Sequence, residues 1–166
     1  MEYIYIGKIV NTHGIKGEVR ILSKFKYKSR VLKKYFKVYI GPSKEENIIN
    51  SYRPHKQFDM ITLEGITNIN EVLKYKGLYA FINKEDLVLE LDEYLDEDLI
   101  DLEVYINNDK KGVVTNIVRY PNNSLIEVTN NEKKYLIPNN KNIIESIDLT
   151  NKKIIIKDIK GLIEWL

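Results

Sequence analysis

The chain has 166 residues, 43% of them hydrophobic and 30% charged, and a formal net charge of +2. This balance is typical of a folded globular protein and not of a disordered one, and the length suits one ordinary domain or two small ones. Because the sequence contains no cysteine, disulfides, thiolate metal sites and a cysteine nucleophile are excluded.

The N-terminal sequence MEYIYIGKIVNTHG has no basic segment followed by a long apolar one, so it does not resemble a secretory signal. No apolar run approaches the roughly 18 residues that a membrane-spanning helix needs. We therefore expect a cytoplasmic protein that does not enter a membrane.

The small net charge hides an asymmetry between the two halves of the chain. Residues 1–86 contain 16 Lys and Arg against 9 Asp and Glu, a net charge of +7, whereas residues 87–166 contain 10 against 15, a net charge of −5. The first half is suited to phosphate-bearing partners, and the second half is suited to basic ones such as ribosomal proteins.

Short strands dominate the first half of the sequence. They are rich in β-branched and aromatic residues and are bounded by Gly, Pro, Asn or Asp. A helix is predicted over residues 68–76, with Asn68 as its N-cap and Gly77 after its end. The predicted strands are residues 2–10, 18–23, 36–41, 47–53, 59–64 and 78–82.

The turn THGIKGE, between the first two predicted strands, raises the question of a phosphate site. A P-loop needs Gly-Lys-Ser/Thr and then a helix, but Gly17 is followed by Glu18 and a strand pattern. The G-x-x-G loop of KH domains clamps RNA but joins two helices. The residues favour a β-turn shaped by Gly14 and Gly17.

His13 is a candidate base or metal ligand, since a neutral imidazole performs both roles. The only other histidine is His55, and neither belongs to an H-x-H or H-E-x-x-H pattern. No G-x-S-x-G serine motif is present either. A structural or hydrogen-bonding histidine is the preferred interpretation, so we predict no catalytic residue, no metal and no cofactor.

An acidic stretch separates the two halves. No basic residue occurs between Lys84 and Lys110, and LVLELDEYLDEDL is interpreted as a linker. Strands follow again, with Asn-rich hairpin turns at 107–109, 122–123 and 130–131, because Asn tolerates positive φ. One or two helical turns are predicted over residues 142–147. The predicted strands are residues 102–107, 111–120, 124–130, 133–138 and 152–158.

Many short, evenly spaced strands predict a mainly β protein built from two small β-barrels in tandem.

The stretch GKIVNTHGIKGEVRI closely resembles the opening signature of the RimM family, bacterial maturation factors of the small ribosomal subunit. The similarity continues through residues 60–87, 91–105, 111–120, 124–128 and 136–157 to Gly161 and Leu162.

The resemblance implies a six-stranded, translation-factor-like barrel over residues 1–86, an acidic linker over 87–97 and a PRC barrel over 98–166. It also implies a non-enzymatic factor, expected as a monomer, that binds the free small (30S) subunit and assists maturation of the head (3′ domain) of 16S rRNA. The implied contacts are rRNA and a head ribosomal protein. Two alternatives remain: an RNA- or membrane-associated PRC-barrel adaptor unrelated to ribosomes, and a hydrolase that uses His13.

The sequence departs from the family pattern at two positions. The family usually has a tyrosine pair in the linker that is implicated in subunit binding, and here Tyr94 is followed by Leu95. The resemblance therefore assigns a binding role to Tyr94 but not to Leu95. The family also often has Gly where Asp101 stands, so a turn that needs positive φ would be strained here, although Asp tolerates it better than most residues.

Residues 16–37 are the most basic part of the chain, with nine Lys and Arg against Glu18 alone. Lysines neutralise rRNA phosphates, and the interleaved aromatics Tyr27, Tyr35 and Phe36 are candidates for stacking on unpaired bases. The opposing interpretation places these aromatics in the core and the lysines in solvent. The predicted rRNA-binding residues are Lys16, Arg20, Lys24, Lys26 and Lys28.

Overall fold

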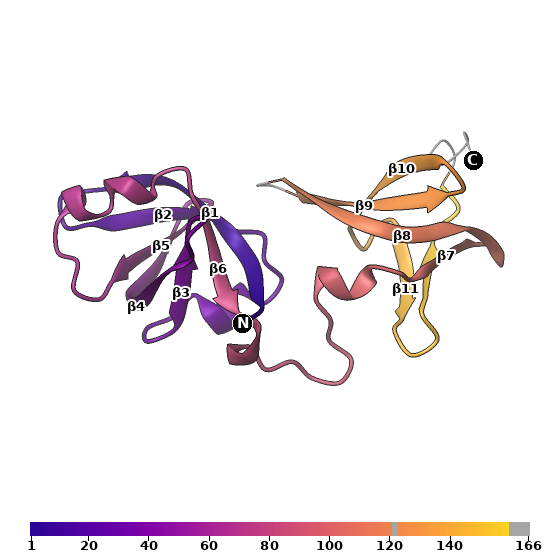
Figure 1. The fold of residues 1–166 in the computed structure, drawn as a ribbon, viewed down its shortest axis with the longest axis horizontal. Coiled ribbons are helices and arrows are strands. Elements are labelled where there is room, and N and C mark those ends of the chain that lie inside the picture. Colours follow the sequence, from indigo (N-terminus) through magenta and orange to yellow (C-terminus); the bar gives the residue numbers. More distant parts are fainter. Residues whose placement is uncertain (121–122, 160–166) are drawn as a thin grey trace. The chain divides into compact units, whose positions relative to one another are not determined.

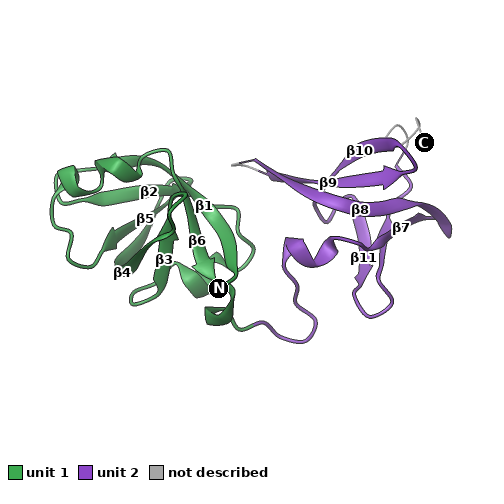
Figure 2. Ribbon diagram, in the orientation of Figure 1, with its two compact units in different colours: residues 1–88 green, residues 89–166 purple. Residues whose placement is uncertain are grey.

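The computed structural model describes residues 1–120 and 123–159, and the chain divides into two compact units, Met1–Val88 and Leu89–Leu166 (Figures 1 and 2). Both units consist mainly of strands, as the sequence predicts. The predicted turn at 122–123 and the C-terminal pair Gly161 and Leu162 lie partly or wholly outside the described residues.

The first unit is a closed six-stranded barrel with the strand order β1-β2-β5-β4-β3-β6. All of its strand pairs are antiparallel. The predicted six-stranded barrel is therefore confirmed. The strands are β1 (Tyr3–His13), β2 (Glu18–Leu22), β3 (Lys37–Ile40), β4 (Glu45–His55), β5 (Phe58–Leu63) and β6 (Tyr79–Asn83). Short helices are α1 (Lys28–Val31), η1 (Ile69–Glu71), η2 (Leu73–Tyr75) and η3 (Lys84–Asp86).

Alternation of side chains along these strands forms the barrel core. On β2, Val19 and Ile21 are fully buried, while the alternating residues Glu18 and Arg20 are only partly buried. The same period of two on β6 buries Ala80 and Ile82 and leaves Tyr79 exposed. This is the pattern expected of a strand with one face on the core and one toward solvent.

The turn between β1 and β2 depends on its glycines. Gly14 and Gly17 have φ angles of 71° and 91°, a region that L side chains rarely adopt. A Cβ on Gly17 would lie 3.0 Å from the backbone oxygen of Asn68, so this position also needs a residue without a side chain. The motif that resembles a phosphate loop is therefore a structural turn packed against the segment around Asn68.

The single helix predicted over residues 68–76 is wrong in its type. The structure has two separate 3₁₀ turns, η1 and η2, and the Asn68 side chain caps neither of them. It instead donates a hydrogen bond from Nδ2 to Oε1 of Glu71 at 3.2 Å. Burial of Val72 and Tyr75 fixes this segment on the barrel, so packing rather than helix length stabilises it.

The second unit contains a six-stranded sheet with the order β10-β9-β8-β7-β12-β11. Among the described strands of this unit, only the β7–β12 pair is parallel. A single 3₁₀ helix, η4 (Asp96–Leu99), precedes the sheet among the described residues. The strands are β7 (Glu103–Ile106), β8 (Asp109–Tyr120), β9 (Asn123–Asn130), β10 (Lys133–Pro138), β11 (Ile144–Asp148) and β12 (Lys153–Ile156).

The helical turns predicted over residues 142–147 are wrong, because Ile144–Asp148 forms strand β11. Asn140 accepts hydrogen bonds from the backbone N–H groups of Asn142, Ile143 and Ile144. These bonds close a turn, and strand β11 begins immediately after it. From Ile144 onward the chain pairs with β12. Pairing with a neighbouring strand therefore overrides the local helical pattern.

Positive φ angles occur at three places where the sequence predicts them, one of which is Asn131 in the predicted turn at 130–131, with a φ of 55°. Asn107 and Asn108, between β7 and β8, have φ of 50° and 70°, as a two-residue hairpin turn of type I′ requires. Asp101 has φ of 74°, so the position where the family often has glycine does adopt the left-handed conformation. Its backbone N–H donates to the Val114 carbonyl at 2.8 Å, which holds the turn in place.

Candidate nucleic-acid interface

The connection between β2 and β3 carries most of the predicted rRNA-binding residues and is firmly anchored to the barrel. Tyr27, Val31 and Leu32 are buried with exposed fractions of 5%, 0% and 1%. The Ser23 hydroxyl donates to the Ile6 carbonyl and accepts from the backbone N–H of Phe25. The connection is therefore a well-held surface feature and not a loose loop.

Lysines on either side of these buried residues face solvent. Lys24 and Lys26 precede Tyr27, Lys33 and Lys34 follow Leu32, and all four are exposed. Residues 24–34 are called the cationic segment below. Lys16, at the tip of the β1–β2 turn, is also exposed. These lysines form a positive surface on a rigid support, which is the arrangement that neutralises phosphates without a large ordering cost.

Lys28 differs from its neighbours because its charge is matched inside the protein. Its Nζ atom lies 2.9 Å from Oδ2 of Asp59, whose side chain is only 4% exposed. The other carboxylate oxygen of Asp59 accepts a hydrogen bond from the Tyr52 hydroxyl at 2.7 Å. Lys28 thus links helix α1 to strand β5. The ammonium group that was predicted to bind rRNA forms an ion pair within the barrel.

Arg20 is also engaged in the barrel. Its Nη2 atom lies 2.7 Å from Nδ1 of His13, and its guanidinium lies 5.6 Å from the Phe58 ring centroid. Because a guanidinium only donates, His13 Nδ1 accepts this bond and the ring proton must lie on Nε2. Arg20 Nε is a buried atom without a hydrogen-bond partner among the described residues.

The groups around His13 are paired with one another. Glu18 accepts two hydrogen bonds from Arg53, at 2.8 and 2.7 Å, and this pairing lowers the pKa of Glu18. The His55 ring lies 5.8 Å from the His13 ring, and burial followed by the charges of Arg53 and Lys56 lowers the pKa of His55. A base at His13 would need a free Nδ1 or an acidic partner, and Arg20 occupies Nδ1.

The interleaved aromatics separate into different roles. Tyr27 is buried under the Arg30 guanidinium, 4.8 Å from its ring centroid, so the prediction that it stacks on bases is wrong. Tyr35 is 69% exposed and stands beside Lys34, whose Nζ lies 5.1 Å from its ring centroid. Phe36 is partly buried. Only Tyr35 of the three offers most of its ring to a partner.

Tyr94 and Leu95 lie just before η4 in the second unit. Tyr94 is partly buried and packs against the core cluster that includes Leu99 and Val104. Leu95 is 3% exposed, and its backbone N–H donates to Oδ2 of Asp98 at 2.8 Å. Leucine at this position is therefore a core residue, and Tyr94 combines a packed ring with remaining exposed surface.

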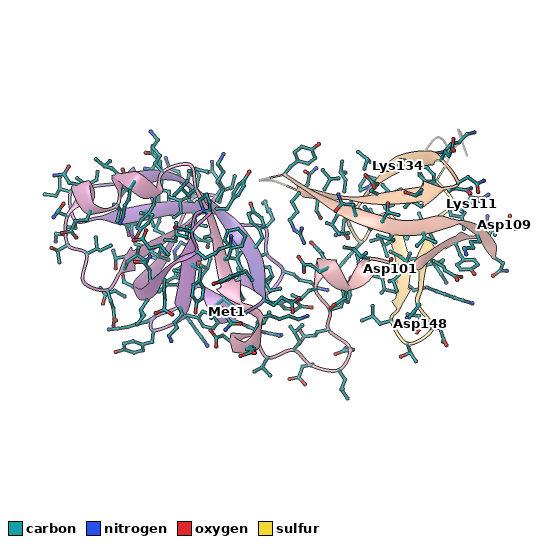
Figure 3. The ribbon with its side chains drawn as sticks, viewed as in Figure 1. Met1, Asp101, Asp109, Lys111, Lys134 and Asp148 are labelled. Carbon is teal, nitrogen blue, oxygen red and sulfur yellow. The ribbon has the colours of Figure 1, made fainter. Side chains whose placement is uncertain are left out.

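Acidic side chains are spread over the second unit. Asp101, Asp109 and Asp148, labelled in Figure 3, are all exposed: Asp101 lies in the turn before β7, Asp109 is the first residue of β8 and Asp148 is the last residue of β11. Hydrogen bonds from the backbone and side chain of Asn151 lower the pKa of Asp148. Residues 87–98 contain six Asp and Glu and no Lys or Arg, whereas residues 99–166 contain nine acids against ten bases, so the net negative charge of the second half lies in the acidic stretch before the sheet. No group of three metal-ligating side chains occurs in residues 1–120 or 123–159.

The sequence analysis missed a group of aromatic side chains on the outer face of the first barrel. Tyr3 and Tyr5 on β1 contact Phe81 on β6, with ring centroids 6.5 and 6.1 Å apart. Tyr3 also contacts Tyr39 on β3 at 5.2 Å, and Tyr5 contacts Tyr79 at 5.4 Å. These five residues are called the aromatic strip below. The spacing of Tyr3 from Tyr5 and of Tyr79 from Phe81 is the period-two signal that predicts a shared face.

The structure thus defines a two-unit β protein whose first unit is a closed barrel with an exposed cationic segment. Family models match both parts: the RimM N-terminal domain over residues 4–87 and the RimM PRC barrel domain over residues 96–162. The chain belongs to the RimM family. This agrees with the predicted fold class of a RimM N-terminal barrel followed by a PRC barrel.

Relatives match over almost their whole length. A ribosome maturation factor RimM from Exiguobacterium sp. (strain AT1b) is 35% identical over 170 residues, covering 99% of this chain and 98% of the relative. One from Staphylococcus haemolyticus is 37% identical over 166 residues, covering 97% and 99%. The solution structure of the N-terminal domain of RimM from Thermus thermophilus is 20% identical, with a TM-score of 0.45, and covers 54% of this chain and 98% of that one.

No helix in the described part of the chain is both long enough and apolar enough to cross a bilayer.

Proposed function

We propose that this chain is a cytoplasmic, non-enzymatic maturation factor of the small ribosomal subunit. It binds the free, immature subunit and assists folding of the head of 16S rRNA. The single observation that carries the proposal is the exposed cationic segment on a rigid barrel, in a chain whose full-length relatives are named ribosome maturation factors.

The first unit contacts rRNA through phosphates. Lys16, Lys24 and Lys26 are exposed, and so are Lys33 and Lys34, which the sequence prediction did not include. We assign these five lysines the direct contacts with phosphate. Arg20 and Lys28 position the surface instead, because His13 and Asp59 occupy their charged groups.

The second unit contacts a basic head protein. Residues 87–166 have a net charge of −5, and this excess of acids lies in residues 87–98. A concentrated negative charge attracts a basic partner and increases the rate of association. Two modest contacts on one chain raise each other's effective concentration, so the factor holds rRNA and protein together until the head is complete.

An adaptor unrelated to ribosomes would also use a cationic surface, and no observation in the structure favours it. The experiment that separates the two is analysis of 16S rRNA precursors in a deletion strain. We expect immature 16S rRNA ends to accumulate and free small subunits to increase, with recovery when this chain is restored. Normal precursor levels in the deletion strain would contradict the proposal.

A further inference from the structure

We infer that the aromatic strip is a second RNA-binding surface that takes unpaired bases of single-stranded RNA by stacking. The strip consists of Tyr3, Tyr5, Tyr39, Tyr79 and Phe81. The inference rests on the proposed function for the identity of the RNA, which would be rRNA, but the surface itself can be tested without ribosomes.

The register of the sheet creates this surface. Tyr5 is paired with Phe81 across β1 and β6, and Tyr39 is paired with Phe81 across β3 and β6. The intervening residues Ile4 and Ile82 point into the barrel and are buried. Three strands that are distant in sequence therefore place their aromatic residues on one outer face.

The strip is exposed to different degrees along its length. Tyr79 is 51% exposed, Tyr3, Tyr5 and Phe81 are partly buried, and Tyr39 is 4% exposed beneath its neighbours. The rings meet edge to face, at interplanar angles of 66° to 84°. Rings held edge to face are fixed in orientation, so Tyr79 presents its surface without losing side-chain freedom on binding.

Lysines lie beside the aromatic rings at two places. Lys44 Nζ lies 4.3 Å from the Phe81 ring centroid and 5.5 Å from that of Tyr3. Lys8 Nζ lies 5.9 Å from the Tyr79 ring centroid. Two acidic groups lie near Tyr39: Glu46 accepts a hydrogen bond from its hydroxyl at 3.3 Å and lies 3.9 Å from Lys37 Nζ, and burial, followed by the charges of Glu46 and Asp86, raises the pKa of Tyr39. The outer rings therefore have cations as neighbours.

This combination fits single-stranded RNA best. Aromatic faces stack on bases of any sequence, while adjacent lysines bind the backbone phosphates that connect successive bases. A protein partner that covered the same rings would have to place acidic groups opposite both Lys8 and Lys44. A duplex does not fit, because its bases are stacked inside the helix and only its phosphates would make contact.

The test uses the full chain and a labelled oligouridylate, with an RNA duplex of equal length for comparison, followed by fluorescence anisotropy. We expect the single strand to bind more tightly, and Tyr79→Ala to weaken its binding by roughly 5-fold to 150-fold, the range seen when one stacked base loses its aromatic partner. Tyr79→Phe should bind as the unchanged chain does. Lys44→Ala should reduce the salt dependence of binding.

Tyr120 provides the matched control, because it is also 51% exposed and lies on β8 in the second unit. Tyr120→Ala should leave affinity for the single strand unchanged. Equal affinity of Tyr79→Ala and the unchanged chain for oligouridylate, with both correctly folded, would overturn the inference. So would equal binding of single strand and duplex. If Tyr79→Ala loses oligouridylate binding while the chain never associates with small subunits, the strip stands and the proposed function fails.

Discussion

The Nζ atom of Lys28 lies 2.9 Å from a carboxylate oxygen of Asp59, and 31 residues of sequence separate the two. Lys28 is 42% exposed on its side chain, but its partner is 4% exposed. An exposed lysine of the cationic segment therefore neutralises a buried charge of the barrel. This distinguishes it from Lys24, which is exposed and precedes the buried ring of Tyr27.

Lys28→Ala should lower the free energy of unfolding by about 1–3 kcal/mol, because Asp59 would lose a charged hydrogen-bond donor while staying buried. Lys24→Ala, at an exposed position, should change it by less than about 0.5 kcal/mol. Urea unfolding of the two variants measures the difference. Equal stability of both variants would show that the Lys28–Asp59 pair does not support the barrel.

Two substitutions of Tyr94 distinguish its role in packing from a role in binding the small subunit. Tyr94→Ala removes a ring that packs against the core of the second unit, so we expect stability to fall by about 1–2 kcal/mol. Tyr94→Phe keeps the packed ring and removes only the hydroxyl, so it should lose much less stability than Tyr94→Ala. If Tyr94 contacts the subunit through its hydroxyl, Tyr94→Phe will co-sediment less with small subunits. Full co-sedimentation of Tyr94→Phe would exclude a contact made by the hydroxyl.

Substitutions of Asp101 test whether the positive φ of this residue, which precedes the second sheet, strains the chain. Asp101→Val should lower stability by about 1–2 kcal/mol, because a β-branched residue is strained at a φ of 74°. Asp101→Gly should not lower it, since glycine adopts this region without strain. Asp109→Val, at an exposed residue outside that region, is the control and should be nearly neutral. Equal melting temperatures for Val and Gly at position 101 would contradict the strained-turn account.

The raised pKa of Tyr135 predicts that the folded protein loses stability at high pH. Burial raises its pKa from 10.0 to about 12, and its hydroxyl donates to the Lys111 carbonyl. The unfolded chain therefore loses this proton near pH 10 while the folded chain keeps it until about 12. Stability from this group is complete below pH 10 and falls as pH rises toward 12. Unfolding measured against pH should show a shallower alkaline decline for Tyr135→Phe; an unchanged slope would be inconsistent with a buried, protonated tyrosine.

Local patterns predicted much of the fold. The period of two identified the strands, the Asn pair at 107 and 108 identified a hairpin turn, and the departure at Asp101 identified a residue with positive φ. Local patterns failed where distant pairing decides the structure. Strand β11 has a helical pattern, but pairing with β12 makes it a strand.

The candidate site shows the same limit. Charge density located the cationic segment, yet it did not separate Lys28 from Lys24, since the difference is a contact with Asp59 on another strand. The aromatic strip was missed because its members come from β1, β3 and β6, and only the barrel register brings them together. Residues that act through neighbours distant in sequence cannot be recognised before that register is known.

The most direct test of the central claim is sedimentation of the chain with purified free small subunits and with complete ribosomes at increasing salt. The chain should travel with free subunits and not with complete ribosomes. Lys24→Glu combined with Lys26→Glu should weaken the association and flatten its salt dependence. Lys76→Glu, an exposed reversal of the same kind elsewhere on the barrel, should not. Unchanged association and salt dependence in the double variant, or equal binding to complete ribosomes, would contradict the account.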